Sequence, residues 1–233
     1  PLYQAFDDIP LVSISHAQRE PLPHARWQGT AYHGMPADLL PCDARPGAYL
    51  AFLGRIAPPK RPDLAIEIAK RAGVPLKIAA KIDAGDRWYY EQNIEALMGH
   101  PSVEYLGELG DRDKQRFLAG ARALLFPIDW PEPFGLVLIE ALACGTPVIA
   151  FRRGSVPEIV EDGRTGFIVD DVEGAVRAVG RLQEIDRQQC RATFEKRFSA
   201  TRMAADYLHL YETLLGGSGQ RIDMRSAASL QGA

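Results

Sequence analysis

The sequence predicts an α/β protein built on a doubly wound parallel sheet, followed by a helical extension. From Tyr49 onward, short apolar segments alternate with longer segments that have helical periodicity. The apolar segments contain few polar residues, as expected for strands buried on both faces of a sheet. After Val172 the pattern becomes helical throughout. Strict alternation is typical of βαβ units, in which helices cover both faces of a parallel sheet.

The apolar segments are expected to be strands because glycine or polar turn residues follow most of them. They are residues 49–53, 76–80, 103–106, 123–126, 147–151 and 166–169. Helices are expected between them over 63–72, 86–98, 111–118, 134–143 and 156–161. The extension is expected to contain helices over 172–184, 187–198 and 201–215.

The first part of the chain differs from this unit. Strands are expected over 11–15 and 29–32, followed by a linker with several prolines. Two strands cannot bury a core by themselves, so we interpret this part as the remnant of a neighbouring domain. The predicted division is a remnant and linker over 1–46, the α/β domain over 47–198, a terminal helix over 199–215 and a disordered tail over 216–233.

Composition restricts the function classes. The formal net charge of -3 provides no electrostatic reason to expect nucleic acid. No apolar run approaches the roughly 20 residues that a membrane helix needs, and no signal peptide is visible, so we expect a cytoplasmic protein. Cys42, Cys144 and Cys190 are widely spaced and predict neither a disulfide framework nor a metal cluster. Cys144 is expected to be a small buried hydrophobe.

The segment Glu132-Pro-Phe-Gly-Leu-Val-Leu-Ile-Glu140 is the strongest functional signal. Glu132 is expected in a loop before a helix, and Glu140 about two turns into it. Backbone N–H groups of Phe134, Gly135 and Leu136 would then form an anion site at the helix start. Such a site suits a ligand with a central phosphate and hydroxyls at both ends, as in a nucleotide-sugar. The alternative is an ordinary helix with an acidic start.

Two basic segments are expected on the same side of the sheet. Gly54-Arg55-Ile-Ala-Pro-Pro-Lys60 follows the first strand of the α/β unit, where ligands bind in open α/β sheets. Gly54 allows a tight turn, and Arg55 and Lys60 can contact a diphosphate. Lys81 ends the next strand and can contact a phosphate or a ribose. The alternatives are a solvated basic loop and a surface lysine.

Two further loops are assigned to the same side. Gly154 is expected to line the ligand cleft, whereas Ser155 and Glu158 are interpreted as simple capping of a short helix. Trp130, before Glu132, is expected either to shape a sugar pocket or to serve as a buried anchor.

Together these residues resemble the C-terminal, donor-binding half of retaining glycosyltransferases of family 4, which have the GT-B fold of two Rossmann-like domains. The resemblance extends over about residues 48–170. The matching segments are Gly54-Arg55-x₄-Lys60, Val103-x-Tyr105-x-Gly107, Glu132-x₇-Glu140, Ala143-Cys-Gly-Thr-Pro-Val148 and Gly154-x₂-Pro157-Glu158.

The resemblance implies a role for each matching residue. Arg55 and Lys60 would bind the donor diphosphate, Glu132 would approach the sugar, and Glu140 would accept hydrogen bonds from the ribose. Phe134, Gly135 and Leu136 would supply N–H groups, and the loop with Tyr105 and Leu106 would lie near the base. The implied reaction is hexosyl transfer with retention from a nucleotide-sugar to an unknown acceptor (a sugar, a lipid or a small molecule). No metal and no other cofactor are implied.

The chain also departs from the family pattern. Arg61 follows Lys60 where glycine is usual, and Lys81-Ile-Asp-Ala replaces a glycine-containing turn. Most of the N-terminal acceptor domain is absent, so the resemblance implies an enzyme truncated here, with a cleft completed by the missing domain or a partner chain. A position at the inner membrane face stays open, as does the choice among UDP, GDP and ADP. The alternatives are a donor-binding module for a separate acceptor chain, an epimerase and a non-catalytic nucleotide binder.

Overall fold

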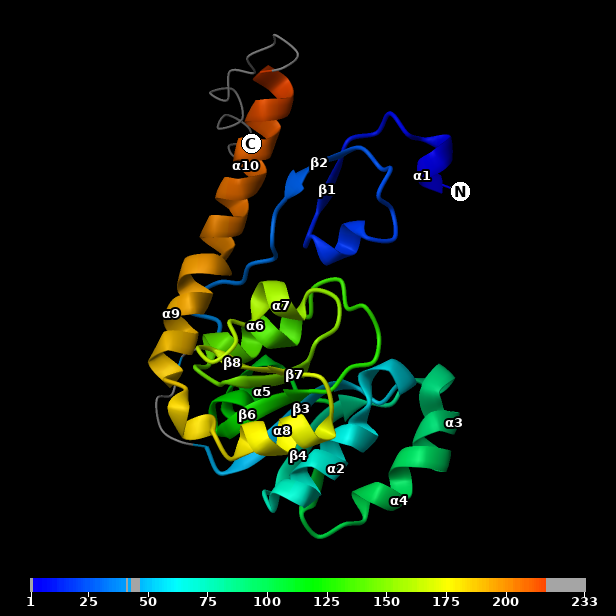
Figure 1. Ribbon diagram of the computed structural model, residues 1–233, viewed down its shortest axis with the longest axis vertical. Coiled ribbons are helices and arrows are strands. Elements are labelled where there is room, and N and C mark those ends of the chain that lie inside the picture. The colour runs from blue at the N-terminus through cyan, green and yellow to red at the C-terminus, as the bar shows by residue number, and fades with distance from the viewer. Residues whose placement is uncertain (1, 41, 43–46, 217–233) are drawn as a thin grey trace, which may run out of the picture.

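A parallel six-stranded sheet forms the centre of the computed structural model, which describes residues 2–40, 42 and 47–216 (Figure 1). The strand order is β5-β4-β3-β6-β7-β8. The strands are β3 (Tyr49–Arg55), β4 (Leu76–Lys81), β5 (Val103–Gly107), β6 (Ala121–Phe126), β7 (Val148–Phe151) and β8 (Gly166–Val169). Numbered from β3, this is the 3-2-1-4-5-6 order of a doubly wound sheet. The predicted fold class is confirmed.

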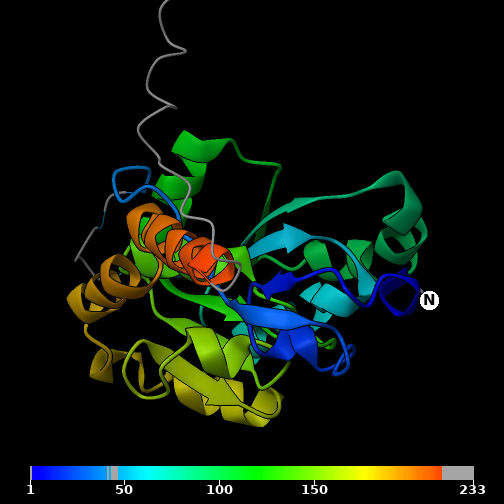
Figure 2. The same cartoon turned by 90° about the horizontal axis from the view of Figure 1, so that it is seen from above.

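Helices cover both faces of the sheet (Figures 1 and 2). One layer contains α2 (Pro62–Ala72), the short α3 (Arg87–Tyr89) and α4 (Glu95–Met98), and α8 (Val172–Val179). The other contains α5 (Asp111–Ala119), α6 (Leu136–Ala143) and α9 (Arg187–Arg197). Every residue of β7 is buried, because both layers exclude water from it.

Two expected helices are interrupted. The helix predicted over 86–98 contains a π-helical segment, Tyr90–Ile94, between α3 and α4. The helix predicted over 172–184 ends at Val179, with Gly180 as its C-cap, and Leu182–Glu184 form a separate 3₁₀ turn. Glycine is a poor helix former and commonly ends a helix. The short helix expected over 156–161 is α7 (Val156–Ile159).

The N-terminal segment lies beside α10 and above α7 in the view of Figure 1. Following α1 (Leu2–Ala5), β1 (Leu11–Ser13) and β2 (Trp27–Thr30) pair in parallel, with the 3₁₀ turn η1 (Ala17–Arg19) between them. α10 (Ala200–Gly216) runs beside β2, and a Cβ added to Gly29 would come within 2.4 Å of Leu210. The predicted tail begins at Gly216, but this residue is the last of α10, so the tail prediction is wrong there. The rest of the predicted tail and most of the predicted proline linker lie outside the described residues.

None of the described helices combines the length and the apolar character that crossing a membrane requires.

Burial of two cysteines predicts how the thiols react. Cys144 and Cys190 are fully buried, and burial raises the pKa of each to about 12, whereas Cys42 is exposed. Because the thiolate is the reactive species, we expect one thiol to react rapidly with a disulfide reagent at pH 8 and two more to react only after unfolding. The free energy of unfolding should fall as the pH rises from about 9 toward 12, because the unfolded chain loses these two protons before the folded protein does. Rapid labelling of all three thiols in the folded protein would contradict the assignment.

Candidate active site

The strand order reverses between β3 and β6, and the loops that leave these two strands carry the predicted site residues. Ligands of open α/β sheets bind beyond the carboxyl ends of the strands at this point. The loop after β3 contains the 3₁₀ turn η2 (Pro58–Lys60). The Asp129 N–H, in the loop after β6, donates to the Pro59 carbonyl at 2.9 Å. The two loops are therefore held together.

A cleft of about 350 Å³ opens at the carboxyl ends of β3 and β4. It brings together five residues predicted from the sequence, namely Gly54, Arg55, Lys81, Leu136 and Glu140. Its lining also includes Glu108, Leu109, Lys114 and Val137, which the sequence analysis missed. Glu108 and Leu109 follow β5 closely, so the argument from strand ends could have found them. Lys114 lies within α5, and no local pattern indicates its role.

The charged side chains of the cleft form pairs. Lys114 Nζ donates to Glu140 Oε1 at 2.9 Å, and both side chains are largely buried. Lys81 and Arg55 contact Asp83 at 2.9 and 3.3 Å. Hydrogen bonds from Lys81 and then Arg55 lower the pKa of Asp83. Exposed pairs of this kind contribute little stability, so a phosphate can replace Asp83 as their partner at low cost.

Lys60 and Glu132 form a second group, outside the described lining of this cleft. Lys60 Nζ donates to Glu132 Oε2 at 2.5 Å, with side-chain exposures of 19% and 10%. Trp130 Nε1 donates to the same oxygen at 3.0 Å, and Lys60 Nζ lies 5.1 Å from the Trp130 ring centroid. Trp130 is 36% exposed, so the alternative of a buried anchor is wrong. The structure thus joins two residues that the sequence analysis placed on different parts of a ligand.

The helix with Glu140 begins two residues later than predicted. α6 starts at Leu136, because Gly135 is left-handed, with φ of 79°. Phe134 is buried, and its ring packs against Tyr32, His33 and Phe198. The N–H groups of the first turn therefore belong to Leu136 and Val137, which line the cleft. Phe134 contributes packing before the helix and does not begin it.

Gly154 supports the Glu132 loop through a close backbone approach. Its φ is 49°, and a Cβ there would lie 2.3 Å from the Glu132 carbonyl oxygen. The next residue, Ser155, donates its N–H to that carbonyl at 2.9 Å. The predicted capping by the Ser155 side chain is wrong, since its hydroxyl donates to the Phe134 carbonyl at 2.9 Å.

Glu158 also differs from the prediction. Its carboxylate accepts hydrogen bonds from the N–H groups of His16 and Ala17 and from the Tyr32 hydroxyl. Its interpretation as simple capping is therefore wrong. Long-range contacts of this kind leave no local pattern in the sequence.

Arg61 stands where the family pattern has glycine, and its backbone conformation is one that favours glycine. It is the non-glycine residue with positive φ in the described chain, at 52°, a conformation that glycine adopts without steric cost. Its guanidinium pairs with Asp63 at 2.8 Å and with Asp129 at 3.6 Å. These contacts hold the strained residue at the start of α2.

Tyr105 and Leu106 lie on the edge strand β5, next to the residues that line the cleft. The Tyr105 hydroxyl donates to the Ala80 carbonyl at 2.8 Å, and Leu106 is half-buried. Neither residue belongs to the lining of the cleft, whereas Glu108 and Leu109, which follow β5, do.

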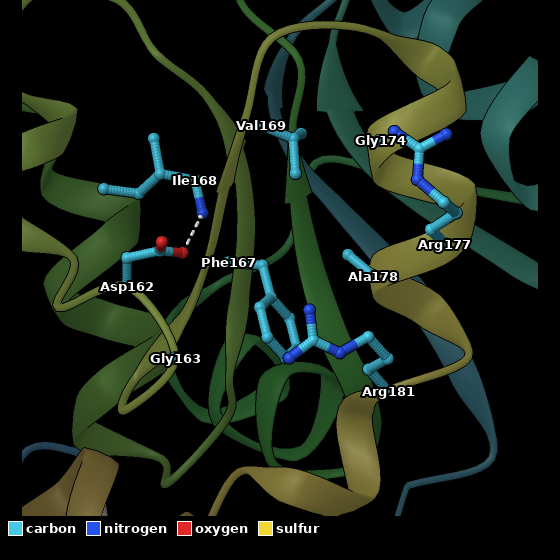
Figure 3. A pocket seen from close by; sticks show the side chains of 9 residues that line it. All are labelled: Asp162, Gly163, Phe167, Ile168, Val169, Gly174, Arg177, Ala178 and Arg181. Carbon is cyan, nitrogen blue, oxygen red and sulfur yellow. Dashed lines mark hydrogen bonds between the residues drawn. The ribbon is translucent and has the colours of Figure 1, made fainter.

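A separate pocket of about 260 Å³ lies between β8 and α8, at the other edge of the sheet (Figure 3). Arg181 lies over the Phe167 ring there, and Asp162 accepts a hydrogen bond from the Ile168 N–H. The pocket contains none of the predicted site residues. In the described part of the chain, no group of three or more His, Cys, Asp or Glu side chains is arranged to hold a metal ion.

Comparison with known proteins identifies relatives of this chain. It is 35% identical to D-inositol 3-phosphate glycosyltransferase of Mycobacterium sp. (strain KMS) over 52% of this chain and 28% of the relative. It is 29% identical to phosphatidyl-myo-inositol mannosyltransferase of Mycolicibacterium smegmatis over 83% of this chain and 52% of the relative. The chain therefore spans about half or less of the length of these relatives.

The solved structures include Anabaena HepE in complex with UDP and glucose, with a TM-score of 0.75 and 20% identity. The match covers 87% of this chain and 62% of HepE. The fold is that of the C-terminal half of GT-B glycosyltransferases, with a C-terminal helix. The family model of glycosyl transferases group 1 matches residues 45–197. This chain belongs to the group 1 glycosyl transferases.

Proposed function

We propose that this chain is the donor-binding part of a glycosyltransferase that transfers a hexosyl group from a nucleotide-sugar with retention of configuration. The observation that carries the proposal is the cleft at the carboxyl ends of β3 and β4. It joins cationic residues, the first turn of α6 and Glu140, and the Lys60–Glu132 pair links the loops that follow β3 and β6.

Each part of the donor has a proposed partner. Glu140 accepts hydrogen bonds from the ribose, and its Oε1 atom also accepts one from Lys114. Glu108 and Leu109, together with Tyr105 and Leu106, surround the base. Arg55 and Lys81, together with the N–H groups of Leu136 and Val137, contact the diphosphate. The proposed contacts require no rearrangement of the sheet or of the left-handed turn at Gly135.

Lys60 and Glu132 are proposed to act where the sugar leaves the diphosphate. Glycosyl transfer builds positive charge on the sugar ring and negative charge on the leaving diphosphate. Preorganised cations beside the diphosphate stabilise that transition state, and here Arg55 and Lys60 supply them. Glu132 lies beside the sugar.

The proposal has three further parts. Transfer needs no metal ion, and the domain division is the one predicted from the sequence. The protein is cytoplasmic or lies at the inner membrane face.

The acceptor is proposed to bind on an N-terminal domain or a partner chain that completes the cleft. The curated relatives named above act on inositol phosphate and on phosphatidyl-myo-inositol according to their names. Cyclic polyols with a phosphate are therefore the first acceptors to test. UDP is the first nucleotide to test, because the structure of HepE contains it.

The proposal is tested by thermal-shift and calorimetric titration with UDP, GDP, ADP and their glucose and mannose conjugates. Ligand binding to the folded protein raises the melting temperature, and we expect one nucleotide to do so selectively. Gly54→Val is the site-blocking control, since Gly54 lines the cleft and a Cβ there meets no described atom within 4 Å; an unchanged melting temperature without ligand checks that this variant is folded. A shift that persists in Gly54→Val, or no shift with any nucleotide, would contradict the proposal.

Replacing Glu140 with alanine is expected to weaken nucleotide-sugar binding by about 1–3 kcal/mol, the cost of losing a hydrogen bond to a charged group. The measurement is calorimetry with the ribonucleotide and its 2′- and 3′-deoxy forms. The deoxy ligand that lacks the bonded hydroxyl should bind the wild type and Glu140→Ala with equal affinity. Equal losses for all three ligands would argue against a ribose contact.

A further inference from the structure

We propose that Glu158 is a positioning residue that fixes the loop of Glu132 through the N-terminal segment. The Glu158 carboxylate holds residues 15–17, and Ser15 in turn holds the backbone of the loop that contacts the donor sugar. This inference rests on the proposed function for its effect on sugar binding, but the contacts themselves belong to the protein without ligand.

Both oxygens of Glu158 are occupied by the N-terminal segment. Oε2 accepts from the His16 N–H at 2.7 Å, and Oε1 accepts from the Ala17 N–H at 2.8 Å. The Tyr32 hydroxyl donates to Oε2 at 3.0 Å. Burial and the hydrogen bond to Glu158 raise the pKa of Tyr32 to about 12, so this donor keeps its proton at neutral pH. Hydrogen bonds to an ionised carboxylate are among the strongest in proteins.

The contact passes to the sugar loop through Ser15. This residue immediately precedes the two N–H groups that Glu158 binds, and its side chain is fully buried. Its hydroxyl donates to the Pro133 carbonyl at 2.5 Å and accepts from the Gln18 N–H at 3.0 Å. Glu158 therefore fixes the backbone next to Ser15. Ser15 in turn binds Pro133, the residue directly after Glu132.

The same short helix also holds the loop directly. Ser155, at the start of α7, donates to the carbonyls of Glu132 and Phe134. α7 thus holds the loop at three successive carbonyls, those of Glu132, Pro133 and Phe134, the middle one by way of Glu158 and Ser15. Figure 1 shows α7 below the helical turn that follows β1.

The geometry indicates that loss of the Glu158 contacts weakens binding of the sugar rather than of the nucleotide. The residues that line the 350 Å³ cleft include neither Glu158 nor Ser15 among those described. Loss of the Glu158 contacts should therefore release the loop of Glu132 and leave nucleoside diphosphate binding unchanged.

The test uses Glu158→Ala, the conservative Glu158→Gln, Ser15→Ala and the control Glu161→Gln. Glu161 pairs with Arg197 and Arg164 at 3.0 Å each, so its replacement removes a carboxylate three residues away without touching η1. Calorimetry gives the affinity for the nucleotide-sugar relative to the nucleoside diphosphate. We expect this ratio to fall about tenfold in Glu158→Ala and Ser15→Ala, the loss of one hydrogen bond of about 1.4 kcal/mol. Glu158→Gln should restore part of it, and Glu161→Gln should leave it unchanged.

Hydrogen exchange of peptides covering residues 130–137, measured without ligand, provides a second readout. Faster exchange there in Glu158→Ala and Ser15→Ala, but not in Glu161→Gln, supports the proposal. Unchanged exchange, or equal loss of affinity for both ligands, overturns it. A wild type that binds no nucleotide would overturn the proposed function, while the exchange data would still decide whether Glu158 positions the loop.

Discussion

Replacing Lys60 with alanine is expected to lower the free energy of unfolding by about 3 kcal/mol, because it leaves the Glu132 carboxylate buried without its cation. Glu132 is 8% exposed, and its bond to Lys60 is 2.5 Å long. The Trp130 N–H remains as one partner, but a neutral donor compensates a buried charge only in part. The measurement is the denaturation midpoint in urea, with the slope checked for two-state behaviour.

Ligand binding should change in the same variant. We expect Lys60→Ala to lose the preference for a nucleoside diphosphate over the nucleoside, because Lys60 is proposed to contact the leaving diphosphate. Calorimetric titration with both ligands measures this preference. Equal binding of both ligands by the wild type would reject the phosphate contact independently of stability.

Two controls separate the buried pair from ordinary surface charge. The double variant Lys60→Ala with Glu132→Gln removes the unpaired charge and should regain most of the lost stability. Lys77→Ala breaks an exposed pair with Glu104, at side-chain exposures of 33% and 55%, and should cost no more than about 1 kcal/mol. A loss in Lys60→Ala as small as that in Lys77→Ala would mean that water reaches Glu132.

Replacing Gly154 with alanine is expected to cost about 3 kcal/mol of stability and to abolish nucleotide-sugar binding. The left-handed backbone, with φ of 49°, costs an alanine about 1–2 kcal/mol. The new methyl group would also lie 2.3 Å from the Glu132 carbonyl oxygen and 2.5 Å from its nitrogen. Overpacking of this kind costs about 1–3 kcal/mol more, and its relief requires the Glu132 loop to move away from the sugar.

Gly163 provides the matched control. It is also left-handed, with φ of 73°, but a Cβ there meets no described atom within 4 Å. Gly163→Ala should therefore cost only the backbone contribution of about 1–2 kcal/mol and keep its affinity for the donor. Equal stabilities of the two variants, measured by urea denaturation, would show that Gly154 has no packing role.

The sequence alone predicts the sheet and the edge of it at which the 350 Å³ cleft opens. The alternation from Tyr49 onward encodes parallel strands, because each apolar strand must be covered on both faces by the helices that follow it. Gly54 and Glu140 could be assigned to one cleft because both lie at the carboxyl side of that sheet. Their positions depend on local periodicity and chain direction, which the sequence records.

The contacts between side chains of the site follow from the tertiary arrangement. Lys60 and Glu132 are 72 residues apart in the chain, and His16 and Glu158 are 142 apart. Lys114 joins Glu140 from a different helix. Such pairs depend on strand order and on how loops pack across the switch point, and neither leaves a periodic pattern. Strand periodicity therefore predicts the location of the site, whereas the partners of its charges follow only from the folded arrangement.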